Sequence, residues 1–214
     1  MVHVLPHWNW EGKEGQAIPV MAYSNAEEVE LFLNGKSLGK KARFSDLWEM
    51  PVGTKVSETG KFVTKYRRVW QVPYEPGILK AVAYQNSKSV AVDEVRTAGA
   101  PAKVKLAADR AVIQADGDDL SFVTVRIEDQ HGNLCPMADN LVHFDVTGAG
   151  TIAAVDNGNA ATTEPFQADH RKAFSGMALL IVRSKAGETG RIKIVATSEG
   201  LSKDSAELIT RRPK

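Results

Sequence analysis

The sequence contains little cysteine and no long apolar run. Cys135 is the single cysteine among 214 residues, so an intramolecular disulfide is excluded and stability must come from packing. No apolar stretch is long enough to span a bilayer, and the first residues lack the basic-then-apolar pattern of a signal peptide. The sequence therefore predicts no membrane partner.

The chain also lacks an excess of either charge. Lysine and arginine number 27, against 26 aspartates and glutamates, and neither half of the chain departs far from this balance. Nucleic-acid binding requires clustered positive charge. We therefore expect no nucleic-acid partner.

A break in the middle of the chain separates two runs of alternating apolar and polar residues. The first run ends near Thr97 and the second begins near Lys103, with Gly99-Ala100-Pro101 between them. Pro101 cannot donate to a strand ladder and biases Ala100 away from helix. We predict two domains, residues 1–98 and 99–214, each large enough to bury a modest core.

The first domain is predicted to be an antiparallel β-sandwich. Its strongest local signal is Val29–Gly39, where an alternating run meets Asn34-Gly35, a pair typical of a tight turn with positive φ, and then returns. Trp70 lies in an alternating run and is expected in the core. The other expected strands are Val2–Leu5, Ile18–Tyr23, Arg67–Tyr74, Ile78–Tyr84 and Val90–Val95.

These motifs resemble a known family. His3–Trp10, Ala22–Asn25, Val29–Gly39 and Tyr74–Gly77 together are similar to the β module that follows the catalytic barrel in glycoside hydrolase family 2 β-galactosidases of the Bacteroides type. One departure is Ala42–Lys65, which is longer than the usual link between the hairpin and the tryptophan-containing strand. We hypothesise that Phe44–Lys65, which carries Trp48, packs against the barrel or a second copy; packing onto its own domain is the alternative.

The second domain reads as another β-sandwich. The turn after Leu120–Asp129 and the glycine-rich loops resemble bacterial immunoglobulin-like modules, and Ala115–Phe122 resembles the terminal module of the same galactosidases. The predicted fold class is therefore all-β, with two tandem immunoglobulin-like β-sandwich domains. The remaining expected strands are Lys103–Leu106, Ala111–Gln114, Leu141–Val146, Gly150–Val155, Ala178–Arg183, Gly190–Thr197 and Ala206–Thr210.

The resemblance implies a function for the chain. In family 2 the two catalytic carboxyl groups lie on a barrel, so this fragment is expected to be non-catalytic and to brace an upstream barrel of the same parent chain, with a contribution to the substrate cleft. By resemblance, the parent is periplasmic or extracellular. A carbohydrate-binding module and a tandem adhesin-like stalk are the alternatives.

Trp8 and Trp10 are the main candidates for contact with an oligosaccharide, together with Trp48. Residues two apart in an extended chain face the same side, about 6.5 Å apart, which suits stacking on sugar rings. The competing interpretation makes Trp8 and Trp10 packing anchors at a domain boundary.

Neither a metal site nor a cofactor is predicted. Asp116, Asp118 and Asp119 could offer oxygen ligands to Ca²⁺, but no full calcium-loop pattern follows, and a polar turn is the preferred interpretation. His3 and His7 lie four residues apart, but Pro6 disrupts any helix between them. Cys135, beside Pro136, is expected to be a buried or half-buried small residue.

Overall fold

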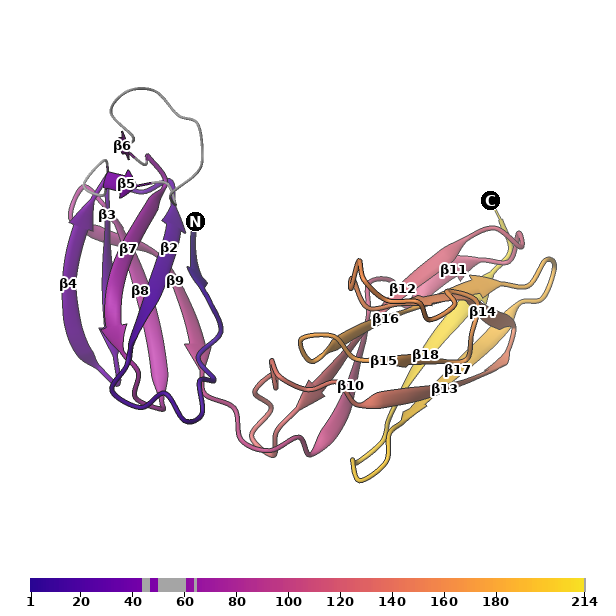
Figure 1. Cartoon of the computed structure of the whole chain (residues 1–214). Helices are drawn as coiled ribbons and strands as arrows, with labels where there is room; N and C mark the ends of the chain where they lie inside the picture. The colour runs from indigo at the N-terminus through magenta and orange to yellow at the C-terminus, as the bar shows by residue number, and fades with distance from the viewer. Residues whose placement is uncertain (44–46, 50–60, 64, 214) are drawn as a thin grey trace. The chain divides into compact units, whose positions relative to one another are not determined.

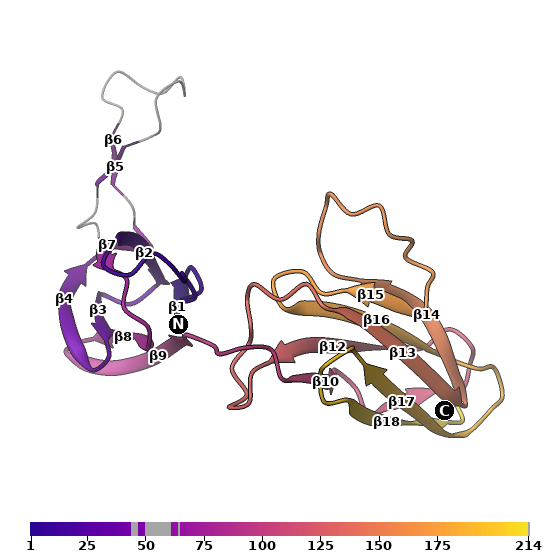
Figure 2. The ribbon, with the colours of Figure 1, turned by 60° about the horizontal axis from the view of Figure 1, so that its bottom comes forward.

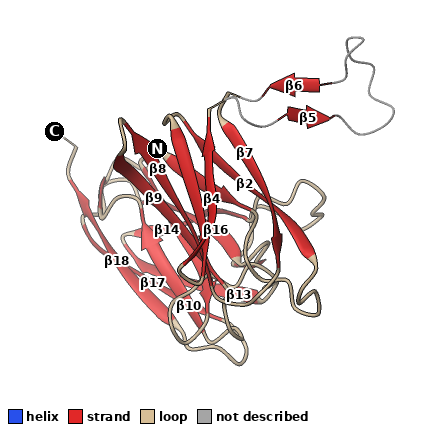
Figure 3. Ribbon diagram, turned by 90° about the vertical axis from the view of Figure 1, so that its left-hand side faces the viewer, coloured by secondary structure: helices blue, strands red, loops and turns tan. Residues whose placement is uncertain are grey.

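The computed structural model describes residues 1–43, 47–49, 61–63 and 65–213. The chain divides into two compact units, Met1–Thr97 and Ala98–Lys214, called here the N-terminal and C-terminal units (Figure 1). Strands and loops make up the described residues, as Figure 3 shows by colour. The all-β prediction is therefore confirmed. Among the residues described, no helix is long and apolar enough to cross a bilayer.

The N-terminal unit packs two antiparallel sheets against each other. Their inward residues, Val20, Leu31, Trp70 and Leu79 among them, form one buried cluster, so Trp70 lies in the core as predicted. The sheet of order β1-β2-β7 contains β1 (Val2–Leu5), β2 (Ala17–Ser24) and β7 (Arg67–Pro73). The sheet of order β4-β3-β8-β9 contains β3 (Glu28–Leu33), β4 (Lys36–Ala42), β8 (Ile78–Gln85) and β9 (Lys88–Arg96).

Part of the segment Phe44–Lys65 forms a further pair of strands. The strands β5 (Leu47–Glu49) and β6 (Lys61–Val63) pair antiparallel, and neither was expected from the sequence. Residues 44–46, 50–60 and 64 lie outside the described residues, so the hypothesis that this segment meets a partner stays a prediction.

The hairpin between β3 and β4 forms as predicted. Asn34 and Gly35 both have positive φ, at 50° and 82°, and Leu33 pairs with Lys36 across the turn. Asn34 also donates from its amide nitrogen to the Glu75 carboxylate at 2.6 Å and accepts from the Ile78 N–H at 2.8 Å. The turn therefore binds the adjacent β7–β8 connection as well as joining two strands.

Gly35→Val is expected to lower the free energy of unfolding of the N-terminal unit by about 1 kcal/mol or more, because a β-branched residue is strained at positive φ. No atom lies within 4 Å of a Cβ at this position, so the effect isolates backbone strain. Gly35→Asn is the matched control, since asparagine tolerates this conformation. Denaturant unfolding followed by tryptophan fluorescence measures both; equal midpoints for the two variants would contradict the turn assignment.

The C-terminal unit is a second sandwich. Its core includes Val123, Ile127, Leu180, Ile192 and Leu208, all fully or almost fully buried. One sheet, in the order β10-β12-β16-β14, contains β10 (Lys103–Ala108), β12 (Leu120–Glu128), β14 (Gly150–Asp156) and β16 (Met177–Ser184). The other, in the order β11-β18-β17-β13-β15, contains β11 (Val112–Gln114), β13 (Leu141–Gly148), β15 (His170–Lys172), β17 (Gly190–Thr197) and β18 (Asp204–Arg211).

Asp129 fixes the start of the C-terminal unit to the turn after β12. Its carboxylate accepts N–H hydrogen bonds from Gly99, His131 and Asn133 at 2.8–2.9 Å, and another from the Asn133 side chain. Burial raises the pKa of Asp129, but these four hydrogen bonds outweigh it and lower the pKa from 3.8 to about 2. The first residues of this unit are thus tied to β12 by one ionised group.

A carboxyl group whose pKa is lowered by folding stabilises the folded state above its unfolded pKa and loses this effect as pH falls towards the folded value. The contribution of Asp129 is therefore complete above about pH 5 and is lost between about pH 4 and pH 2. Asp129→Ala is expected to destabilise the C-terminal unit by about 2 kcal/mol at pH 7 and to flatten its stability in this pH range.

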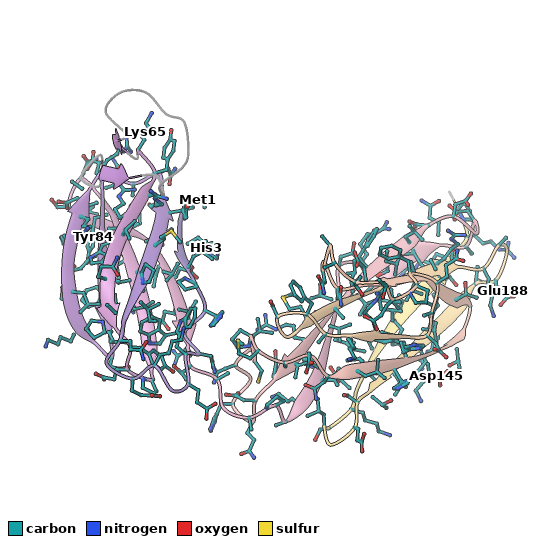
Figure 4. All side chains as sticks on the ribbon, viewed as in Figure 1. Met1, His3, Lys65, Tyr84, Asp145 and Glu188 are labelled. Carbon is teal, nitrogen blue, oxygen red and sulfur yellow. The ribbon has the colours of Figure 1, made fainter. Side chains whose placement is uncertain are left out.

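Cys135 supplies the measurement, because it is the only cysteine and is buried in the C-terminal unit. Its rate of reaction with a thiol reagent in denaturant reports unfolding of this unit alone. Asp145→Ala is the control, since Asp145 projects from the exposed side of β13 (Figure 4). An equal response of the two variants at pH 7 would contradict the role assigned to Asp129.

Candidate functional site

Trp8 joins three segments of the N-terminal unit. Its indole nitrogen donates to the Glu75 carbonyl oxygen at 2.9 Å, and its ring meets Tyr74 edge-on with centroids 5.2 Å apart. Its own carbonyl oxygen accepts from the Thr97 hydroxyl at 2.6 Å. The residue is 0% exposed, so in the folded unit its ring offers no face to a sugar. The structure thus fits the packing-anchor interpretation of Trp8 and not the carbohydrate-binding one.

Trp10 lies in a different environment. It is partly buried, its ring stacks on the imidazole of His7 at 4.8 Å, and its indole nitrogen donates to the His7 carbonyl oxygen at 3.0 Å. The ammonium of Lys13 lies 5.0 Å from its ring centroid. Burial lowers the pKa of His7, which favours the neutral imidazole in the stack. Trp10 stays a candidate for contact with sugar.

The structure assigns no strand to the segment that contains Trp8 and Trp10. The strand β1 ends at Leu5 and β2 begins at Ala17, and irregular chain with turns and bends connects them. The two-residue alternation therefore does not apply. The backbone of Trp48 pairs with that of Phe62, but the Trp48 side chain lies outside what the structure describes, so its role stays a prediction.

A hollow on the outward side of the sheet β4-β3-β8-β9 is a further candidate that sequence reasoning missed. Its volume is about 480 Å³, within the range of small-molecule pockets. Phe32, Lys80 and Glu94 lie opposite one another on three adjacent strands. The complete lining consists of Phe32, Asn34, Gly35, Ile78, Lys80, Val82 and Glu94.

Charged side chains lie next to the apolar residues that line this hollow. Lys80 Nζ lies 3.2 Å from one carboxylate oxygen of Glu94, and the guanidinium of Arg96 lies 2.9 Å from the other. The hydrogen bond from Lys80 is the largest cause of the lowered pKa of Glu94. An aromatic ring, a carboxylate and an ammonium are groups that can contact a sugar ring and its hydroxyls. The sequence did contain a signal for this hollow: Phe32, Val82 and Val92 are apolar at outward positions of their strands, where a sheet face in water would carry polar residues.

The acidic turn at residues 116–119 has the hydrogen bonds of a polar turn. One carboxylate oxygen of Asp116 accepts from the N–H groups of Asp118 and Asp119 at 2.9 and 2.8 Å. Asp119 pairs with Arg110 at 2.8 Å. In the described ranges, no group of three histidine, cysteine, aspartate or glutamate side chains could hold a metal ion. His3 pairs with Asp93, which also accepts from the Val4 N–H and so links β9 to β1.

Family models match both units. Residues 104–207 match the glycoside hydrolase family 2 C-terminal domain 5, and residues 15–91 match a domain family described only as of unknown function, DUF4982. Each match lies inside one of the two units.

Individual relatives agree with the family matches. A β-galactosidase of Bacteroides ovatus is 46% identical over 202 residues, which are 94% of this chain and 21% of that protein. A putative β-glucuronidase of Formosa agariphila is 34% identical over 86% of this chain and 16% of its own length. The crystal structure of a β-glycosidase from Bacteroides vulgatus, 33% identical, superposes with a TM-score of 0.85 over 97% of this chain and 24% of that one.

The chain thus spans about a fifth of the length of the curated relatives it matches. The family model over the C-terminal unit describes a C-terminal domain, as expected from the motifs at Ala115–Phe122. The chain therefore belongs to glycoside hydrolase family 2, as the C-terminal β-sandwich part of such a protein.

Proposed function

We propose that this chain is a non-catalytic brace for the catalytic barrel of a β-galactosidase-like parent protein. The observation that carries the proposal is the 46% identity, over 94% of this chain, to a fifth of a β-galactosidase. Two sandwiches with complete cores, each matched by its own family model, also suit a supporting role. These relatives favour a brace over an adhesin-like stalk. By the same resemblance, the parent is periplasmic or extracellular.

The test compares the full parent protein with a version that lacks these 214 residues. We expect truncation to lower the temperature of inactivation of β-galactoside hydrolysis by 5 °C or more, because a docked domain stabilises what it binds. The isolated chain should hydrolyse a chromogenic β-galactoside no faster than buffer does. A truncated parent with unchanged inactivation, or hydrolysis by the isolated chain, would contradict the proposal.

Carbohydrate binding is the second candidate function, and the hollow lined by Phe32, Lys80 and Glu94 favours it. Affinity electrophoresis in gels containing galactan or another β-linked glycan tests it with the isolated chain. Retardation that is lost in Phe32→Ala or in Trp10→Ala would assign the binding residue. Retardation unchanged in both, or none in the unmodified chain, would speak against these residues as a sugar site.

A further inference from the structure

The two outward faces of the C-terminal unit differ in chemistry. On the five-stranded sheet, the outward positions of β13, β17 and β18 include Asp145 (Figure 4), and also Lys193 and Glu207. All three are exposed, and Lys193 lies opposite Glu207. Most outward positions of β13, β17 and β18 are polar, as expected where a sheet faces water, although Val112, Leu141 and Ile209 are also exposed on this side. The outward residues of the other sheet of this unit can be compared with this side.

The outward face of the sheet β10-β12-β16-β14 is apolar along β16, with Thr124 of β12 in register with Leu179. The strand β16 reads Met177-Ala178-Leu179-Leu180-Ile181-Val182, with no polar residue in six positions. Its inward residues are buried, whereas Met177, Leu179 and Ile181 point outward. Phe122 on β12 and Ala154 on β14 lie on either side of Ile181. We call Phe122, Ala154, Met177, Leu179 and Ile181 the apolar face.

A strand that is apolar at successive positions is typical of a sheet covered on both sides. In this unit only the inward side of β16 packs against the core cluster. Phe122 and Met177 are 40% and 37% exposed. A contiguous exposed apolar area of this kind marks an interaction surface.

Cations lie at both ends of the apolar face, and the acidic residue Asp156 is in register with Leu179 on β14. Lys105 and Arg126 are in register with Met177 at one end, and Arg183 lies beside Leu120 at the other. The carboxylates that pair with the first two, Asp204 and Glu128, are 24% and 11% exposed and so lie deeper than the cations. Within the described part of the chain, Arg183 has no ion-pair partner.

This charge pattern disfavours a second copy as the occupant. A two-fold axis along the strands would bring each cationic end against itself, and one across the strands would bring Lys105 and Arg126 against Arg183. Both arrangements juxtapose like charges, which opposes association. A complementary occupant carries carboxylates around an apolar centre.

The length of the relatives indicates which polypeptide covers the apolar face. The chain corresponds to 21% of the related β-galactosidase and 24% of the solved β-glycosidase, so most of such a protein lies outside these 214 residues. We propose that the apolar face is the surface by which the C-terminal unit docks onto the remainder of its parent polypeptide, at an apolar patch edged with acidic groups. This inference rests on the proposed bracing function and locates its contact surface.

Thiol labelling tests the proposal. Phe122→Cys and its control Lys193→Cys, at the centre of the polar face, are prepared in the 214-residue chain and in the full parent protein. Peptide mapping separates the new thiols from Cys135, which is buried. In the 214-residue chain both new thiols should react with a maleimide at similar rates. In the parent, Phe122→Cys should react at least tenfold more slowly, and Lys193→Cys within twofold of its rate in the isolated chain.

Three results would overturn the inference. The first is equal labelling of Phe122→Cys in the parent and in the isolated chain. The second is protection already present in the isolated chain, which would place the occupant within these 214 residues. The third is a concentration-dependent dimer of the isolated chain that protects the same thiol. If truncation destabilises the parent while Phe122→Cys stays reactive there, the proposed bracing function is supported and only the assignment of the apolar face as its contact surface is wrong.

A substitution that introduces charge gives an independent readout. Ile181→Lys in the parent should lower the temperature of inactivation by several degrees while leaving the melting temperature of the 214-residue chain within 2 °C, because the side chain is outward and partly exposed there. Lys193→Ala should change neither. A similar loss in the chain and in the parent would mean that Ile181 acts only within its own unit and would contradict the docking role.

Discussion

Replacing Trp8 by alanine is expected to destabilise the N-terminal unit by about 3–5 kcal/mol, the usual cost of deleting a fully buried large aromatic side chain. The indole fills core space beside Tyr74 and donates to the Glu75 carbonyl oxygen, so the variant loses packing and also this hydrogen bond. Since a domain of this size is stable by only about 5–15 kcal/mol, much of its stability is lost.

Tryptophan fluorescence measures this effect selectively, because Trp8, Trp10, Trp48 and Trp70 all lie in the N-terminal unit. Trp10→Ala is the control and should cost at most about 2 kcal/mol, since Trp10 is only partly buried. Trp8→Phe should recover part of the loss and keeps the experiment interpretable if Trp8→Ala does not fold. A smaller loss for Trp8→Ala than for Trp10→Ala would show that Trp8 is not the anchor.

Arg171→Leu is expected to destabilise the C-terminal unit by about 3 kcal/mol. Arg171 is 0% exposed, and its guanidinium donates to the carbonyl oxygens of Val155 and Pro165 at 2.8 and 3.1 Å. It also lies 3.6 Å from the Glu164 carboxylate and over the ring of Phe166. Arg171 therefore fastens the connection between β14 and β15, which Figure 2 shows as a loop, to the edge of β14.

Cys135 reactivity in denaturant measures the loss, as for Asp129. Arg191→Leu is the matched control, because the Arg191 side chain is 80% exposed and its pair with Glu207 should contribute less than 1 kcal/mol. Limited proteolysis adds a local readout: in Arg171→Leu, cleavage between residues 157 and 169 should accelerate. Arg171→Lys keeps the positive charge but loses the planar guanidinium group that donates several hydrogen bonds. We expect its stability to lie between those of the unmodified chain and Arg171→Leu. Equal stability of Arg171→Leu and Arg191→Leu would contradict the role of Arg171.

Much of the fold could be predicted because its signals are local. The pair Asn34-Gly35 is enough to predict a turn with positive φ. The four residues Val69 to Val72, which alternate, are enough to predict that the Trp70 side chain lies in the core. The motifs that identified the family are also short and occur in order along the chain. Burial of Arg68 was detectable in the same way, because Arg68 shares the inward side of β7 with Trp70 and Val72.

The remaining features depend on residues far apart in sequence. The environment of Trp8 is made by Tyr74, Glu75 and Thr97, more than 60 residues later, which no pattern around Trp8 reveals. The three residues of β15 have no apolar alternation and form a strand because β13 offers an edge and Arg171 is drawn inward. The hollow at Phe32 likewise requires the register of three strands to be known.

The strand order of the C-terminal unit has a consequence for how the protein is made. The last strand, β18, lies between β11 and β17 in the interior of its sheet, so β11 has no neighbour in that sheet until Arg211 has emerged from the ribosome. The N-terminal unit ends with β9, an edge strand, and contains all its strands once Thr97 has emerged. Domains generally fold as units during synthesis. The N-terminal unit should therefore be folded while more than half of the C-terminal unit is still being translated, and nascent chains stalled short of Arg211 should be resistant to protease only up to the Gly99-Ala100-Pro101 region.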